Sequence, residues 1–301
     1  MVLLIKFIAW FYAAVPLPVS LWFGRMIGRM LWVILPRKRK LAISSLASGF
    51  PDWTEEKCLA MTRQVFLNQG IFIAEMFRFF GHAKENPLDS IQFDPDDLVE
   101  ARRLHAEGRG LLVLTGHLNN YEFLARWAAR HFPMTIITKN ISPPSLNDYL
   151  NDNRRSMGVD VLPPRNSYRA ALRALKENRC VGFILDQNMK HRDGVFVSFF
   201  SRPACTTAGL AMLSAMSGAP VLPVFLLREG NGFKVRILPA IPPPASRETG
   251  ALQDVTQLYS NAMETVIREQ PESWIWIHNR WKTNPKPGDR ITLPDGSVRH
   301  A

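Results

Sequence analysis

Apolar residues occur in short runs through the middle of the chain, and these runs predict the strands of a buried sheet. The run LLVL at 111–114 is followed by the turn signal Thr115-Gly116 and then by apolar residues at helical spacing. Short apolar runs and helical stretches alternate as far as residue 269. Such alternation is typical of α/β proteins, so we expect a mostly parallel central sheet flanked by helices. The expected strands are 111–114, 134–138, 181–185, 221–227 and 234–238, and the expected helices are 97–106, 121–130, 146–157, 168–177, 207–216 and 252–269.

The first forty residues have a different pattern. Residues 7–24 carry no charged side chain, although two prolines interrupt them, and four basic residues follow at 37–40. An apolar segment beside a basic cluster is typical of the cytoplasmic, anionic face of a membrane. We therefore expect residues 1–40 to be a retained N-terminal hydrophobic membrane anchor with a basic flank. It could be one kinked span or a helix lying in the interface, and a buried hydrophobic helix of a soluble domain is the alternative.

Two other segments have clear patterns. Residues 54–80 begin with the helix-start pattern Thr-Glu-Glu and then become apolar on nearly all sides, which favours a helix that fills the core. Glu75 lies in this apolar run and needs a partner if it is buried. The tail from residue 283 is rich in proline, glycine and charge, and we expect a loop or a frayed end there.

Composition and charge narrow the classes of partner. The chain has 301 residues, of which 47% are apolar, and its formal net charge is +11. A positive surplus of this size favours an anionic partner such as phospholipid, an acidic carrier protein or nucleic acid. The basic residues are dispersed and no recognition motif stands out, which counts against nucleic acid. Cys58, Cys180 and Cys205 are far apart and match no metal spacing, so we expect no metal site and a reducing compartment.

The candidate chemistry centres on His117, which follows the turn after the first predicted strand. Asn119 and Asn120 can cap the next helix, and Glu122 lies five residues after the histidine. Five residues along a helix rotate a side chain by about 500°, so the two meet only if His117 lies in the loop. Glu122 could then hold the imidazole in one tautomer, beside helix-start N–H groups that suit an oxyanion or a phosphate. The alternative is a capped helix with a surface histidine and glutamate.

Other charged residues stand near predicted strand ends. Arg154 and Arg155 follow a helical stretch, and Asp186-Gln187 ends an apolar strand. Ligands of open α/β sheets lie beyond the carboxyl ends of the strands, so His117 and Asp186 could face one cleft. The arginines would suit a phosphate or a carboxylate. The alternatives are a solvated helix face for the arginines and a turn or helix cap for Asp186.

At this point several motifs carry a family resemblance. GHLNNYE at 116–122 resembles the H-x4-D/E motif of glycerolipid and lipid A acyltransferases. Further blocks resemble, in order, the bacterial lipid A biosynthesis (lauroyl/myristoyl) acyltransferase family, which belongs to the H-x4-D/E lysophospholipid acyltransferase-like superfamily. The resemblance covers nearly the whole chain. The blocks are RRSMG at 154–158, ILDQN at 184–188, GVFVSFFSRPACTT at 194–207, GAPVLPVFLLR at 218–228 and ESWIWIHNRWKTNP at 272–285.

The chain departs from the family pattern at a few positions. Tyr121 stands where the family usually has tryptophan, and Asn188-Met189-Lys190 replaces an acidic or aromatic residue followed by glycine. VSFFS at 197–201 stands where the family often has VPFFG. These differences leave the acceptor and the chain length open.

The resemblance implies a glycerolipid acyltransferase-like fold, with residues 41–301 as the acyltransferase domain. It implies transfer of a fatty acyl chain from a thioester of acyl carrier protein or coenzyme A to a hydroxyl of a lipid A precursor or similar glycolipid. No cofactor beyond that co-substrate is implied. The expected partners are membrane lipid and acyl carrier protein. The expected location is the bacterial inner membrane, with the catalytic domain on its cytoplasmic face.

The resemblance also assigns roles to the candidate residues. His117 would act as general base and Glu122 would orient it. Arg154 would bind a phosphate of donor or acceptor. The remaining expected substrate contacts are Asn120, Asp186 and Gln187, of which the last two would shape the cleft or orient the acceptor.

Other activities remain open from the sequence. The acceptor could be another amphiphile, such as a lysophospholipid or a phosphatidylinositol mannoside. A thioester or lipid hydrolase is a second alternative, although the G-x-S-x-G motif of serine esterases is absent. A non-enzymatic membrane-associated binding protein is a third, but it would have no use for a histidine and a carboxylate beside a helix start. The oligomeric state is not predicted.

Overall fold

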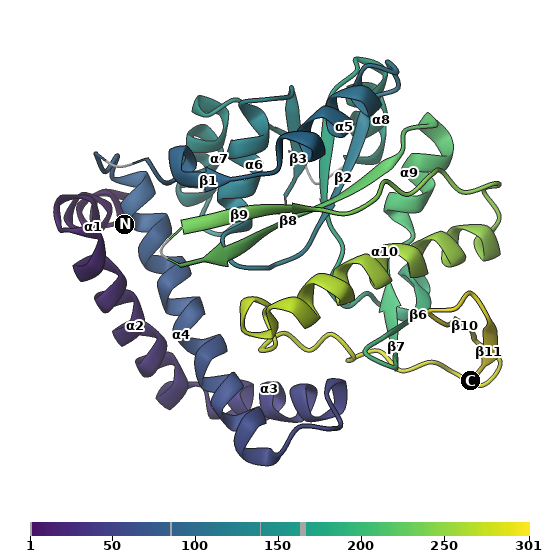
Figure 1. Ribbon diagram of the computed structural model, residues 1–301, viewed down its shortest axis with the longest axis horizontal. Coiled ribbons are helices and arrows are strands. Elements are labelled where there is room, and N and C mark those ends of the chain that lie inside the picture. Colours follow the sequence, from purple (N-terminus) through teal and green to yellow (C-terminus); the bar gives the residue numbers. More distant parts are fainter. Residues whose placement is uncertain (1, 85, 139, 163–166, 231) are drawn as a thin grey trace.

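The computed structural model describes residues 2–84, 86–138, 140–162, 167–230 and 232–301, and its centre is a seven-stranded sheet (Figure 1). The strand order is β1-β9-β8-β2-β5-β3-β4, with β2 in the middle. Neighbouring strands are parallel except for the β8–β9 pair. The predicted α/β fold with a mostly parallel sheet is therefore confirmed. The strands are β1 (Ile91–Gln92), β2 (Leu111–Thr115), β3 (Met134–Ile137), β4 (Val159–Leu162), β5 (Cys180–Ile184), β8 (Val221–Glu229) and β9 (Gly232–Ile237).

The sheet buries both of its faces, which explains why its strands read as continuous apolar runs. Leu111 and Val113 point into a core that contains helices α5 and α6, whereas Leu112 and Leu114 point into a second core with α8, α9 and α10. The predicted helices are all present, with small shifts at their ends. They are α5 (Pro95–His105), α6 (Tyr121–Ala129), α7 (Pro144–Ser156), α8 (Ser167–Lys176), α9 (Gly209–Ser217) and α10 (Thr249–Glu269).

A second sheet, of order β11-β10-β6-β7, corrects our prediction for the C-terminal tail. β6 (Val195–Phe199) and β7 (Arg202–Thr206) form a hairpin, and β10 (Arg290–Thr292) pairs with β6 and with β11 (Val298–His300). The expected loop or frayed end is thus partly strand. Gln253 of α10 donates hydrogen bonds of 2.7 Å to the carbonyls of both Phe196 and Arg290, which joins the tail to the hairpin.

The N-terminal region forms four helices, α1 (Val2–Ala14), α2 (Leu17–Ile34), α3 (Pro36–Gly49) and α4 (Glu55–Phe80). α2 lies very close to α4, because Gly24 and Gly28 face Gly70. A Cβ atom on Gly70 would overlap the backbone of both other glycines. α1 packs near the end of α4, where Arg78 donates to the carbonyl of Tyr12 over 3.0 Å. Within the described residues, none of the helices has both the length and the apolar character required to cross a bilayer.

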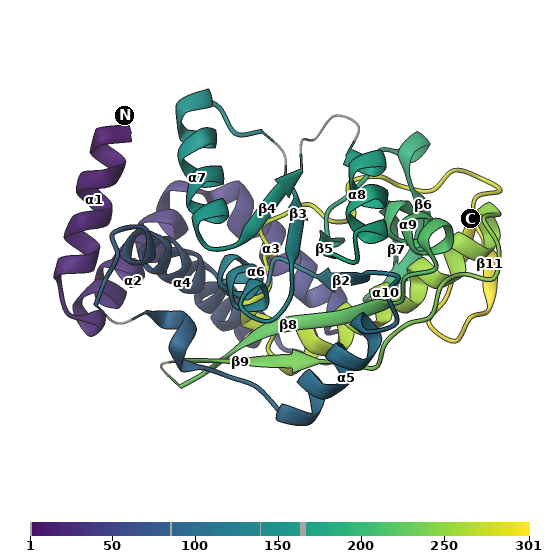
Figure 2. The same ribbon diagram turned by 90° about the horizontal axis from the view of Figure 1, so that it is seen from above.

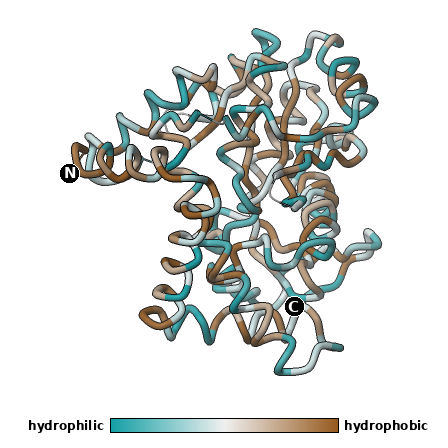
Figure 3. The backbone as a smooth tube through the Cα atoms, turned by 60° about the vertical axis from the view of Figure 1, so that its left-hand side comes forward, coloured by the Kyte–Doolittle hydropathy of each residue, from teal (hydrophilic) through white to brown (hydrophobic). Residues whose placement is uncertain are grey.

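α1 and α2 expose an apolar surface on the side away from α4. Figure 2 shows α1 at one end of the molecule and the C-terminus near the other, and in Figure 3 the helix next to the N label is largely brown. Most large apolar side chains of a domain are buried, and a concentration of exposed ones on two neighbouring helices marks a site of interaction. We call it the N-terminal apolar face; its members are Leu3, Leu4, Phe7, Trp10, Phe11, Val19, Trp22, Met26, Met30, Val33 and Ile34.

Candidate functional site

The register of two central strands brings His117 and Asp186 together. β2 and β5 are parallel neighbours in which Thr115 pairs with Ile184, and each of the two site residues stands two positions further along. Gly116 keeps the connection narrow, since a Cβ atom there would lie 2.7 Å from Leu118 and 3.3 Å from the Asp186 carboxylate. The site therefore lies at the carboxyl edge of the sheet, where ligands of α/β proteins bind.

Asp186 holds His117 through the ring and through the backbone. The ring atom Nδ1 lies 2.7 Å from Oδ1 of Asp186, and the amide of His117 donates to Oδ2 over 2.8 Å. The indole Nε1 of Trp274 donates to the same Oδ2 over 2.7 Å. An ionised carboxylate only accepts hydrogen bonds, so Nδ1 carries the proton and Nε2 is left as the acceptor. The arrangement prepares Nε2 to take a proton.

The electrostatics of this pair stabilise the positive charge that His117 gains when Nε2 takes up a proton. Burial by itself would raise the pKa of Asp186, but the charge and hydrogen bonds of His117, together with Trp274, lower that pKa below its ordinary value. Burial would lower the pKa of His117, yet the Asp186 carboxylate outweighs it and the pKa of His117 is raised above 6.5. Asp186 thus stabilises the imidazolium that forms when His117 accepts a proton.

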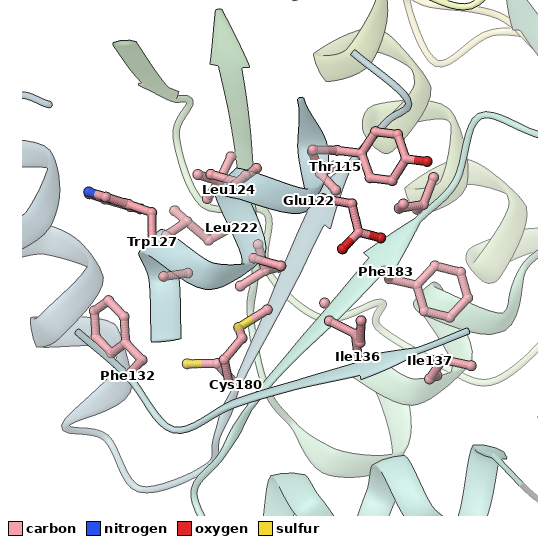
Figure 4. Close-up of a pocket in the computed structure, with 18 of the residues that line it drawn as sticks. Thr115, Glu122, Leu124, Trp127, Phe132, Ile136, Ile137, Cys180, Phe183 and Leu222 are labelled. Carbon is pink, nitrogen blue, oxygen red and sulfur yellow. The ribbon is translucent and has the colours of Figure 1, made fainter. Parts of the chain in front are cut away.

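His117 lines a cavity of about 380 Å³, part of whose lining is drawn in Figure 4. Nε2 lies 3.4 Å from the side-chain nitrogen of Gln187, a long contact that an incoming hydroxyl could displace. The Tyr121 ring meets the imidazole edge-on at 4.9 Å between centroids, and Phe72 of α4 stacks on Tyr121. The imidazole is thereby fixed on two sides and open toward the cavity.

Most of the cavity wall is apolar. The lining comes from α6 and from β2, β3, β5 and β8, and the polar residues His117, Glu122, Arg154 and Gln187 stand at the carboxyl end of the strands. Figure 4 shows Thr115, Glu122 and Phe183 toward one end and Trp127, Phe132 and Cys180 toward the other. Apolar walls with a few polar groups at one end suit an amphiphilic ligand with a long hydrocarbon part.

The carboxylate of Glu122, which we expected to hold the His117 ring, is hydrogen-bonded to two arginines, and its negative charge contributes to the raised pKa of His117. Arg126, one helical turn further along α6, donates to it over 2.6 Å, and Arg154 at the end of α7 donates over 2.5 and 3.3 Å. Burial would raise the pKa of Glu122, but Arg154 and Arg126 lower it. The contact with the histidine is made by Asp186 instead.

Arg154, which we expected to bind a phosphate, is a buried partner of Glu122 that also lines the cavity. It donates to Asn151 over 2.8 Å. Two guanidinium groups share one carboxylate here, so this Glu122 cluster (Glu122, Arg126 and Arg154) leaves one positive charge beside the cavity. Arg155 is exposed and pairs with Asp152, in agreement with the alternative of a solvated helix face.

Asn120, which we expected to contact substrate, is not among the residues that line the described cavity. It is the N-cap residue of α6, but its side chain makes no capping bond and is fully buried. Its amide donates to Glu75 over 3.1 Å, and Glu75 also accepts from Arg228 over 2.6 Å. Asn120 therefore joins the start of α6 to α4, and Glu75 has the partners that its burial requires.

Sequence reasoning did not single out Trp274, Arg126 or Arg280. Arg280 is fully buried and donates to the carbonyls of Gln187 over 3.0 Å and Cys205 over 2.8 Å, and to the Thr206 hydroxyl. It fixes the loop that carries Asp186 and Gln187. The signal for both Trp274 and Arg280 lies in the block ESWIWIHNRWKTNP, where so many aromatic and basic residues close together indicate a special packing role.

With this geometry in place, comparison with known proteins identifies the family. Residues 1–283 match the family described as bacterial lipid A biosynthesis acyltransferase. The chain belongs to this family. As a member of the lipid A biosynthesis acyltransferases, the protein is an enzyme that transfers acyl groups to lipid.

Three relatives of the acyltransferase illustrate the range of the family. It is 27% identical to the lipid A biosynthesis palmitoleoyltransferase of Escherichia coli (strain K12), over 92% of this chain and 90% of that protein. It is 26% identical to the lauroyltransferase of the same organism, over 93% and 90%. A phosphatidylinositol mannoside acyltransferase of Mycobacterium tuberculosis (strain CDC 1551 / Oshkosh) is 28% identical over 74% and 71%.

Proposed function

We propose that the protein moves a fatty acyl chain from a thioester to a hydroxyl of a lipid A precursor or a similar glycolipid. The observation that carries this proposal is the His117–Asp186 pair at the polar end of a long apolar cavity. The cavity suits the hydrocarbon chain of the donor, and the histidine suits the hydroxyl of the acceptor. The names of the lipid A transferases among the relatives support this acceptor class.

In the reaction, Nε2 of His117 removes the proton of the acceptor hydroxyl, and the oxygen attacks the thioester carbonyl. A C–O bond forms and a tetrahedral oxyanion results. The first amides of α6, which has no side-chain cap, lie beside the loop and can stabilise that oxyanion. The C–S bond then breaks, and the thiol leaves with the proton that His117 held. Asp186 stabilises the imidazolium between these two steps.

For the donor we propose an acyl carrier protein. The formal net charge of +11 favours a carrier with an acidic surface. The thioester and its chain would enter from the carboxyl edge of the sheet, where Arg154 and Gln187 line the cavity. Acyl-coenzyme A carries the same thioester, so a direct comparison of the two donors tests this choice.

For the location we propose the cytoplasmic face of the bacterial inner membrane, with the N-terminal apolar face in the interface. Trp10 and Trp22 are 61% and 53% exposed on this face, and indole rings favour the headgroup zone. Arg25, Arg29 and the basic run at 37–40 lie on α2 and α3, where they can bind anionic lipid. α1 also touches α7, whose Arg154 lines the cavity, so this face adjoins the catalytic region.

The proposed function is tested with purified protein in mixed micelles. Labelled acyl-carrier-protein and acyl-coenzyme A donors are each offered with a tetra-acylated lipid A precursor, a lysophospholipid or a phosphatidylinositol mannoside. We expect label in the lipid A precursor with the intact protein and almost none with His117→Ala, since a general base contributes about 10²–10⁴-fold. Label in another lipid would contradict the acceptor, and release of free fatty acid alone would indicate a hydrolase.

A further inference from the structure

The wall of the cavity is built in layers, because three parallel strands run side by side in register. Residues of one strand that share a face are two positions apart, so successive layers are about 7 Å apart. Next to the catalytic loop, Thr115 pairs with Ile184. The layer below contains Val113 of β2, Gly182 of β5 and Ile136 of β3, and the third contains Leu111, Cys180 and Met134.

The middle layer lacks a side chain at its central strand. Gly182 lies between Val113 and Ile136, and all three line the cavity. Its backbone does not require glycine, because its φ is not in the left-handed region. A Cβ atom there would lie 2.8 Å from Cε of Met134 and 3.3 Å from Ile136, so the end of the Met134 side chain lies over Gly182. Added volume at position 182 would therefore push this flexible end into the cavity.

Of the three layers, the third, with Met134 and Cys180, lies furthest along the strands from His117. Leu222 of β8 pairs with Val113 and so lies beside the middle layer. Leu222 and Ile237 also line a second hollow, on the side of α5 that faces the segment 238–243. These two side chains therefore separate the cavity from another open space.

We infer that Gly182 and Met134 determine the length of the acyl chain that the enzyme accepts. Gly182 leaves room in the middle layer for the end of the Met134 side chain, and that side chain stops the acyl chain. This inference rests on the proposed function, since it assigns the cavity to the acyl chain. It predicts that added volume at position 182 shortens the preferred chain and that lost volume at position 134 lengthens it.

The experiment compares Gly182→Val, the milder Gly182→Ala and Met134→Ala with the unaltered protein. Two quantities are measured across a series of saturated chains of increasing length: the relative transfer rate from acyl carrier protein, and the equilibrium binding of the free fatty acids. One methylene in an apolar pocket changes discrimination by about tenfold or more. We therefore expect Gly182→Val to lower transfer and binding of the longest accepted chain at least tenfold relative to shorter chains. Met134→Ala should move the optimum to longer chains.

The matched control is Val181→Ala, since Val181 is the neighbour of Gly182 on β5 but belongs to the core on the opposite face of the sheet. Its chain-length preference should equal that of the unaltered protein. If transfer occurs but all variants keep the same preference, the inference is wrong and the proposed function stands. Altered binding preferences without transfer by the unaltered protein would support the length-determining residues and contradict the acyltransfer step. Thermal melting shows whether each variant is folded. If Gly182→Val does not fold, the chain-length preferences of Gly182→Ala and Met134→Ala test the inference.

Discussion

The carboxylate of Asp186 accepts from both the ring and the backbone of His117, at 2.7 and 2.8 Å. The double contact fixes the side chain and the loop that carries it at the same time. A catalytic base needs both, because its proton acceptor must point at the substrate and must have the right tautomer. Asp186 is therefore placed to position His117 for the proposed reaction.

Asp186→Asn should lower turnover by about a hundredfold or more, since the neutral amide cannot support the imidazolium. The transfer rate of the unaltered protein should rise with pH as His117 loses its proton, with a midpoint above 6.5 because its pKa is raised. Without the carboxylate that raises this pKa, the midpoint should move to lower pH. A pH–rate profile measures the shift, and an unchanged midpoint would show that Asp186 does not act on His117.

Glu122→Gln should mainly reduce stability. It leaves Arg126 and Arg154 buried without their carboxylate, and loss of one partner from a buried ion pair costs about 3–5 kcal/mol. The pKa of Glu122 is lower in the folded protein than in the unfolded chain, so ionised Glu122 stabilises the fold at any pH above its pKa in the unfolded chain. This stabilisation is lost as the pH falls through the pKa that Glu122 has in the folded protein. At neutral pH the variant should therefore unfold at a lower denaturant concentration than the unaltered protein. On acidification its free energy of unfolding should fall less than that of the unaltered protein.

A control for this measurement is Glu100→Gln, which alters an exposed pair with Arg103 at 2.7 Å. Exposed pairs contribute little to stability, so its unfolding curve should stay close to that of the unaltered protein.

The pH–rate midpoint of Glu122→Gln should move less than that of Asp186→Asn, because the glutamate acts on His117 only through space. A larger movement would return Glu122 to the role that the sequence had predicted.

Gly70→Ala should destabilise the protein by about 1–3 kcal/mol, because the new Cβ forces α2 away from α4. Activity should fall as well, since Phe72 and Glu75 on α4 contact Tyr121 and Asn120 beside the catalytic loop. The free energy of unfolding and the transfer rate are both measured. Gly250→Ala, where the new Cβ would meet nothing within 4 Å, is the control and should leave both unchanged or slightly improved. If Gly70→Ala and Gly250→Ala have the same free energy of unfolding and the same transfer rate, the close packing of α2 on α4 does not have the predicted effect.

Replacement of both Trp10 and Trp22 by glutamate should weaken binding to vesicles of anionic phospholipid. Burial of a large apolar side chain contributes about 1.5–3 kcal/mol, so the double variant should bind at least tenfold more weakly in a sedimentation assay. Leu258→Glu changes an exposed residue of α10 and should bind like the unaltered protein. If the tryptophan double variant binds the vesicles as tightly as the unaltered protein, the N-terminal apolar face does not contact the membrane.

The sequence predicts the central sheet well because its strands are buried on both faces. LLVL and VGFIL are apolar without interruption, so local composition identifies them. The short strands β10 and β11 have no such signal. Residues 290–292 become a strand because β6 and Gln253 offer hydrogen bonds to them, and those partners are distant in the sequence. The strands β4, β6 and β7 were not predicted either.

The same contrast between local and distant partners applies to the site. His117 could be recognised from its position after a strand and a turn, and the cleft it shares with Asp186 follows from the general rule for α/β sheets. Its partner could not be chosen from spacing, because Glu122 is near in sequence whereas Asp186 becomes near only when β2 and β5 pair. Trp274 is more distant still and reaches the pair through the bridge between its own backbone and that of Leu118.

The contact between α2 and α4 also limits how the enzyme can evolve. Gly70 is opposed by backbone atoms of Gly24 and Gly28, and neither position has a side chain that could be shortened. A compensating substitution at the contact therefore cannot restore the space that a larger residue at position 70 takes. In a genetic selection starting from Gly70→Ala, we expect true revertants at that codon, or suppressors elsewhere that raise stability in general, and none at positions 24 or 28.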